Sequence, residues 1–158
     1  MKYFATPALL LMLLLAGCST EPEEFTLIYT MESAQNYKIS IEIGKDKSYQ
    51  IRQQNLFFDS HAGKAQINTS DGQMSDEDHA LLTELVAGSR LFRMKNEYGF
   101  EQKPNPNNPL EGLIYQLTYT QGKKTKYISV RVDPSHRYPD NFLQLLRFLS
   151  NYTSQNAP

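Results

Sequence analysis

The chain has 158 residues, a length that allows one domain of ordinary size plus a targeting segment. Its 16 Lys and Arg residues nearly balance 17 Asp and Glu residues, which excludes the strongly basic surface typical of nucleic-acid-binding proteins. The chain contains one cysteine, so it cannot form an internal disulfide.

The N-terminal segment predicts a cleaved signal peptide. Lys2 and the α-amine form a short positive start, and the apolar run Ala8–Ala16 follows. A membrane-spanning helix needs about 20 apolar residues, whereas the apolar region of a signal peptide needs about 7–15. We therefore expect residues 1–17 to direct the chain to the cell envelope and to be removed.

The end of the apolar run resembles the lipobox of bacterial lipoproteins. Leu15-Ala16-Gly17-Cys18 is a leucine, two small residues and a cysteine. The resemblance implies that a diacylglyceryl group is attached to the thiol of Cys18, that cleavage occurs between Gly17 and Cys18, and that the new α-amine is then acylated. Two or three acyl chains give stable anchoring, so the expected lipid partner is a bilayer. The alternative is an ordinary secretory signal with a chance cysteine.

Residues 18–24 form the expected tether between lipid and domain. In enterobacterial lipoproteins, Asp at the position after the cysteine favours retention in the inner membrane. Ser19 occupies this position here, so the segment resembles the outer-membrane class. Glu21, Glu23 and Glu24 resemble the acidic surface-export signal of Bacteroidota lipoproteins, although a simple solvated linker explains them equally well. We expect an anchor in the outer membrane. The domain could lie on the periplasmic face or on the cell surface, and the sequence does not choose between the two.

Three strands are predicted after the tether. The segments Phe25–Met31, Tyr37–Ile43 and Ser48–Gln54 alternate apolar and polar residues with the period of two that a half-buried strand requires. Gly44 supplies the turn between the second and third strands. A fourth strand is expected within 64–69, with a turn at positions 71 and 72.

A helix is predicted to begin at Ser75. Asp78 lies three residues after this N-cap in a capping-box arrangement, and the acids at 76–78 suit the positive end of the helix dipole. Gly88 is expected to end the helix. The predicted apolar stripe consists of Leu81, Leu82, Leu85 and Val86, and we expect Leu91–Met94 to pack back under the helix.

The C-terminal half predicts a loop, a hairpin and a second helix. Three prolines place a long loop across 96–112. Alternation predicts strands at Leu113–Thr120 and Thr125–Val132, and apolar residues at helical spacing predict a helix over Asp140–Tyr152. The residues 153–158 are expected to be a flexible tail.

The order of elements predicts an α+β fold. We expect an antiparallel sheet of two hairpin units with two amphipathic helices packed on one face, forming a two-layer sandwich in a single domain over 25–152. This layout loosely resembles the emfourin-like metalloprotease inhibitors. No motif in these residues identifies that family, so no function or residue role is transferred from it.

No constellation of catalytic residues is visible. The spacing of the three histidines matches no local metal motif, although His79 and Asp76 lie one helical turn apart. A calcium loop around Gly72 is excluded because Ile67 would occupy the first ligand position. The carboxylates Glu97 and Glu101 could converge with others, but any surface offers such sets. We therefore predict no catalytic, cofactor-binding or metal-binding residue.

Two segments are candidates for contact with an envelope or extracellular protein. Phe57 and Phe58 form an apolar group in an irregular segment, where core packing is the ordinary explanation. Tyr98 and Phe100 belong to the long loop, and long loops are often functional.

The sequence thus favours a membrane-anchored lipoprotein with a non-catalytic binding or inhibitor domain. One version is an immunity protein that blocks a periplasmic toxin. The alternatives are a hydrolase or metal-dependent enzyme whose site forms only in three dimensions, and an accessory protein for envelope assembly.

Overall fold

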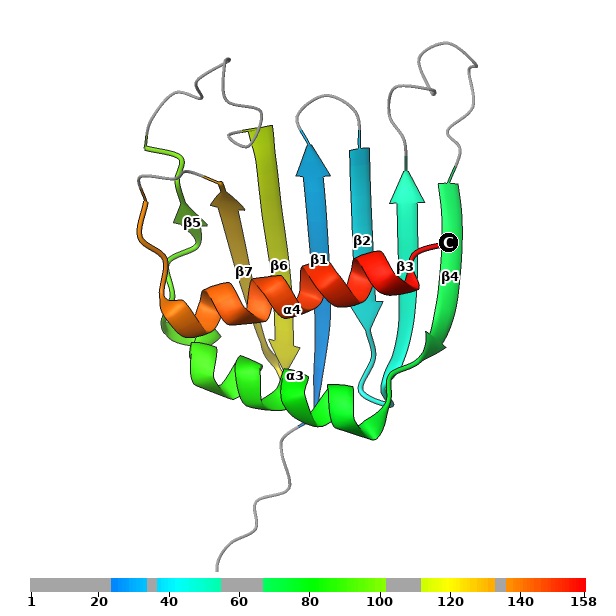
Figure 1. The fold of residues 1–158 in the computed structure, drawn as a ribbon. Helices are drawn as coiled ribbons and strands as arrows, with labels where there is room; N and C mark the ends of the chain where they lie inside the picture. Colours follow the sequence, from blue (N-terminus) through cyan, green and yellow to red (C-terminus); the bar gives the residue numbers. More distant parts are fainter. Residues whose placement is uncertain (1–23, 34–36, 55–66, 102–111, 133–135) are drawn as a thin grey trace, which may run out of the picture.

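The computed structural model describes residues 24–33, 37–54, 67–101, 112–132 and 136–158. They form one seven-stranded sheet with helices α3 and α4 packed on the same face (Figure 1). The α+β two-layer fold predicted from the sequence is therefore confirmed. None of the helices in these ranges is long and apolar enough to cross a membrane.

The strand order is β4-β3-β2-β1-β6-β7-β5, with β1 at the centre. All neighbouring pairs are antiparallel except β5 and β7, which run parallel, so the sheet is mixed rather than wholly antiparallel. The strands are β1 (Phe25–Ser33), β2 (Tyr37–Ile43), β3 (Ser48–Gln54), β4 (Ile67–Gln73), β5 (Glu97–Tyr98), β6 (Leu113–Gln121) and β7 (Lys124–Arg131).

The core lies between the sheet and the helices α3 (Asp76–Ser89) and α4 (Asp140–Asn156). Alternate residues of the central strands are buried, as the period of two predicts, while Ile28 and Tyr127 on the opposite face are exposed. The fully buried strand residues include Leu27, Tyr29, Ile39, Ile41 and Ile51, and those of α4 include Phe142, Leu145 and Leu149.

The fourth strand differs from the prediction. It runs from Ile67 to Gln73 instead of ending near position 69, and positions 71 and 72 pair with β3 instead of forming a turn. The expectation of a turn rested on the Asp-Gly pair, but the register with β3 keeps both residues extended. The glycine serves close packing, because the ring of Tyr49 lies beside Gly72.

Helix α3 begins as predicted and ends later. The hydroxyl of Ser75 accepts a hydrogen bond of 3.1 Å from the backbone N–H of Asp78. The predicted stop at Gly88 is wrong, because the left-handed residue is Arg90, with φ of 49°. The start of α4 stabilises this later end of the helix, since the side-chain amide of Asn141 donates a hydrogen bond of 3.0 Å to the carbonyl of Gly88.

The predicted apolar stripe of α3 is narrower in the structure. Leu82 and Val86 are buried and Leu85 is partly buried, but Leu81 is 44% exposed. After the helix, Leu91 begins a short 3₁₀-helix, η2 (Leu91–Arg93), and packs into the core. The expected packing of this turn under the helix is therefore confirmed for Leu91.

The C-terminal elements follow the prediction with two corrections. Within the expected loop, Glu97 and Tyr98 form the short strand β5 beside β7. Helix α4 continues to Asn156, and Thr153 is only 1% exposed, so the predicted tail does not begin at position 153. Thr153 therefore belongs to the buried side of the helix.

Candidate functional site

Four of the residues singled out from the sequence lie outside the described ranges. These are the lipidation and cleavage positions Cys18 and Gly17, and the candidate contact residues Phe57 and Phe58.

Tyr98 and Phe100 are described, and each packs against neighbouring side chains. The ring of Tyr98 lies 6.1 Å from that of Tyr138 and 6.3 Å from that of Phe142, which belongs to the core. The guanidinium of Arg131 lies 4.5 Å from the ring centre of Phe100. Both side chains are partly buried, and their contact with a partner stays a prediction.

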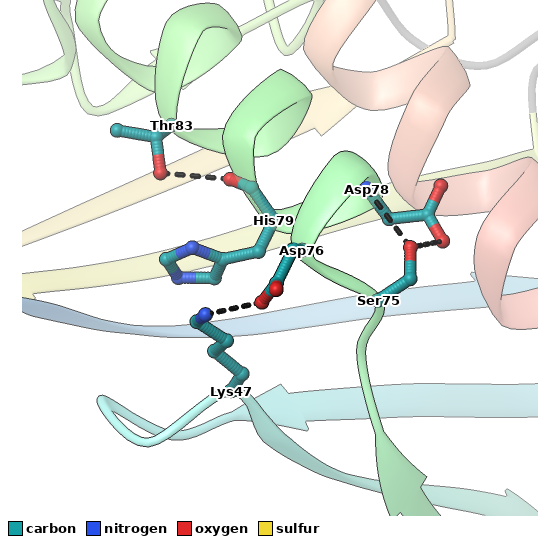
Figure 2. A network of polar contacts seen from close by, with 6 residues as sticks. All are labelled: Lys47, Ser75, Asp76, Asp78, His79 and Thr83. Atoms are coloured by element: carbon teal, nitrogen blue, oxygen red, sulfur yellow. Dashed lines mark hydrogen bonds and ion pairs between the residues drawn. The ribbon is translucent and has the colours of Figure 1, made fainter.

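His79 and Asp76 both lie in the first turn of α3, where Asp76 pairs with Lys47 (Figure 2). The carboxylate of Asp76 accepts a hydrogen bond of 2.6 Å from Nζ of Lys47, and this contact lowers the pKa of Asp76. The imidazole of His79 stacks on Phe25 with ring centres 6.0 Å apart, and burial lowers its pKa below the ordinary value. In the described part of the chain, no three His, Cys, Asp or Glu side chains gather where they could hold a metal ion.

A groove of about 530 Å³ lies between α3 and the adjoining ends of β1 and β6. The residues that α3 contributes are three and four positions apart, so they lie on one face of the helix. The groove is lined by Phe25, Thr83, Val86, Ala87, Arg90, Leu91, Phe92, Arg93, Tyr119 and Gln121. We call this site the basic groove.

Aromatic rings form one part of the groove. The ring of Tyr119 lies 5.6 Å from that of Phe25 and 5.3 Å from that of Phe92. Phe25 and Tyr119 are buried, whereas Phe92 is 40% exposed. A ligand in the groove would therefore meet a fixed aromatic surface with an accessible ring beside it.

The charge of the groove comes from Arg90 and Arg93. No Asp or Glu is among its lining residues, and neither arginine forms an ion pair within the described ranges. Lys124 lies next to the groove, because it pairs in register with Gln121. This arrangement favours an anionic group attached to an apolar body.

The backbone at Arg90 is held in an unusual conformation. Its φ and ψ of 49° and 47° lie in the left-handed region, which costs a residue with a Cβ atom about 1 kcal/mol. Glycine is the usual residue at this place after a helix. An arginine here therefore places a cation at the groove at some expense of stability.

Sequence reasoning did not identify the basic groove. The signal was present in Arg90-Leu91-Phe92-Arg93, where two cations flank an apolar pair after a helix. The sequence predicts only that Leu91–Met94 packs back under the helix, which holds for Leu91 but not for the exposed Phe92. The contributions of β1 and β6 are distant in sequence, and only the fold brings them together.

The chain matches no model of a known protein family and no curated protein sequence at a significant level.

Proposed function

We propose that this chain is a lipid-anchored protein of the bacterial envelope whose domain binds a protein partner without catalysis. The basic groove would receive an acidic segment of that partner. The observation that carries the proposal is the pair of arginines, Arg90 and Arg93, beside an aromatic surface, with no carboxylate among the described lining residues.

The residue types of the groove support recognition of protein. Arginine and aromatic side chains are enriched where protein interfaces gain most of their binding energy. A guanidinium binds a carboxylate through two parallel hydrogen bonds, which fixes its orientation as well as its charge. Phe92 would pack against an apolar side chain of the same segment.

The position of the groove agrees with the expected anchor. Phe25 lines the groove and lies seven residues after Cys18 in the sequence. Seven extended residues reach at most about 25 Å. If Cys18 carries lipid, the partner segment would be bound within that distance of the membrane surface.

The proposal can be tested by crosslinking in living cells. A photoreactive amino acid at position 92 should crosslink to one envelope protein, at a segment rich in Asp and Glu. A synthetic peptide of that segment should bind the purified protein in isothermal titration calorimetry. Combined Arg90→Glu and Arg93→Glu substitutions should lower the affinity for the peptide at least about tenfold, because both cations are replaced by negative charges that repel the acidic peptide.

Arg52→Glu provides a charge-reversal control outside the groove. Arg52 is exposed on the sheet face away from the helices, so its reversal changes net charge without touching the groove. Peptide affinity should stay within about twofold of the unsubstituted protein. The proposal fails if the crosslinked segment is basic, if the groove variant binds equally well, or if Arg52→Glu weakens binding as much.

A further inference from the structure

Strand β4 forms one edge of the sheet, and within the described residues it pairs only with β3 (Figure 1). Neither α3 nor α4 extends past β4 in this view. Edge strands are commonly blocked against further pairing by lysine, by proline or by a bulge. The sequence of β4, INTSDGQ, contains neither residue, and the strand pairs with β3 without interruption. The edge is therefore built to accept another strand.

The unpaired backbone groups of β4 belong to its odd-numbered residues. The N–H of Met74 donates a hydrogen bond of 2.9 Å to the carbonyl of Lys47, so these two residues form a hydrogen-bonded pair that continues the ladder of β3 and β4. Hydrogen-bonded and non-hydrogen-bonded pairs alternate along an antiparallel ladder. The even-numbered residues of β4 therefore bond to β3. The residues whose N–H and C=O groups point away from the sheet are Ile67, Thr69, Asp71 and Gln73.

A second copy of β4 fits this edge in one register that uses the whole strand. Antiparallel pairing centred on Ser70 joins position 69 of each copy to position 71 of the other, and position 67 to position 73, so all the outward groups are bonded. A shift of the centre to position 71 places Asp71 opposite Asp71 of the second copy, and a shift to position 69 places it opposite Ile67. Both shifted registers also shorten the paired segment, so the one centred on Ser70 is favoured.

The side chains agree with this register. Thr69 faces Asp71 of the other copy, so that a hydroxyl meets a carboxylate that accepts its hydrogen bond. Arg52 is opposite Thr69 in β3, so its Cα atom lies in the same row as that aspartate, about 10 Å away and within reach of a long side chain. Arg52 donates a hydrogen bond of 2.7 Å to Gln50 and forms no ion pair within the described ranges. Pairing of two copies thus brings opposite charges together on both sides of the interface.

We propose that two copies of this chain associate through β4, antiparallel and centred on Ser70, so that their sheets join into one continuous sheet. The two-fold axis passes beside Ser70, and the same surface serves both copies. The basic groove lies between α3 and the ends of β1 and β6, away from this edge, so the association does not depend on the function proposed for the groove.

Cysteine crosslinking tests the register in the purified full chain, with Cys18→Ser removing the only native thiol. Position 70 of one copy faces position 70 of the other in a non-hydrogen-bonded pair, with Cα atoms about 4.5 Å apart, a distance that a disulfide spans. Mild oxidation of Ser70→Cys should therefore convert most of the protein to a disulfide-linked dimer on a non-reducing gel. Asn68→Cys is the matched control, because its two copies lie about 13 Å apart along the strands and should crosslink at least about tenfold less.

Sedimentation equilibrium measures the association without a crosslink. Thr69→Asp, at an exposed position, should weaken the dimer about tenfold, because the new carboxylate faces Asp71 of the other copy twice in each dimer. Adding Asp71→Thr exchanges the two residues, places a carboxylate opposite a hydroxyl again, and should return the dissociation constant to within about threefold of the original. Thr125→Asp adds the same charge at an exposed position of β7 and should change it by less than about twofold.

Three results would overturn the proposal. The first is a full chain that stays monomeric at about 100 μM, which would leave the edge to a strand of another protein. The second is crosslinking of Asn68→Cys as readily as Ser70→Cys, because association through any other segment is indifferent to these positions. The third is a failure of the exchange at positions 69 and 71 to restore a dimer weakened by Thr69→Asp.

Discussion

The ring of Tyr49 lies against Gly72 of the neighbouring strand, so closely that a Cβ atom at position 72 would lie 2.6 Å from Cζ of the tyrosine. The same ring packs edge-on against Tyr152 of α4, with ring centres 5.6 Å apart. Its hydroxyl donates a long hydrogen bond of 3.4 Å to Oδ1 of Asn156. The glycine thus makes room for a side chain that joins the edge of the sheet to the end of α4.

The substitution Gly72→Ala should destabilise the domain. A methyl group would displace the Tyr49 ring from Tyr152, and overpacking of this kind costs about 1–3 kcal/mol. The free energy of unfolding, measured by urea denaturation followed by circular dichroism, should fall by that amount.

The control places Gly72→Ala in a Tyr49→Ala background. Without the ring the methyl group meets no obstacle, and alanine in a strand is then neutral or favourable relative to glycine. An equal loss of stability in both backgrounds would show that Tyr49 is not the reason for the glycine.

The substitution Arg90→Gly should stabilise the domain by about 1 kcal/mol, because glycine adopts the left-handed conformation without the strain of a Cβ atom. It should also lower the affinity for the partner segment proposed to bind in the basic groove. Thermal and urea denaturation give the first quantity, and calorimetric titration gives the second. Arg93→Gly is the matched control, since Arg93 lacks a positive φ and should show no gain in stability.

The pKa of His79 should lie below 6.5 in the folded protein, since burial disfavours the charged imidazole. Lys47 lowers this pKa further and Asp76 partly offsets the effect. Lys47→Gln should therefore raise the pKa of His79, and Asp76→Asn should lower it. An NMR titration of the imidazole signals measures each value, with His79→Gln identifying the resonance.

The same shift predicts how stability depends on pH. Because the folded-state pKa is depressed, the unfolded chain binds more protons just below pH 6.5, so the free energy of unfolding should decrease as the pH falls from 6.5 through the folded-state pKa. His79→Gln should remove this part of the dependence. Persistence of the full dependence in that variant would assign it to other groups.

The lipoprotein interpretation predicts a specific processing defect. Globomycin, which blocks the lipoprotein signal peptidase, should cause a heavier precursor to accumulate, and Cys18→Ser should prevent incorporation of labelled palmitate. Gel mobility and fluorography measure the two effects. Normal processing and labelling in both experiments would leave the segment as an ordinary secretory signal or no signal at all.

Local patterns predicted most elements of the fold. The bounds of β2 and β3 agree with the structure because alternation over seven residues selects a strand with one buried face. The start of α3 agrees because Ser75 and Asp78 satisfy the cap through groups three residues apart. Both signals depend only on neighbours along the chain.

The errors occurred where distant residues decide the outcome. Gly72 stays in a strand because β3 pairs with it, and Gly88 stays in a helix because Asn141 of α4 binds its carbonyl. The strand β5 has only two residues, too few to show any periodicity, and it forms by pairing with β7. Intrinsic preferences of about 1 kcal/mol yield to such contacts.

The amino-acid sequence by itself determined the class of fold, since burial of alternating and helical apolar patterns requires a sheet covered by helices on one face. It also contained the lipobox-like segment, whose role remains a prediction. Only the tertiary structure decided which side chains come together in a candidate binding site. The basic groove joins α3 to β1 and β6. No local period encodes this site, because it exists only after strands distant in sequence have paired and the helix has packed on them.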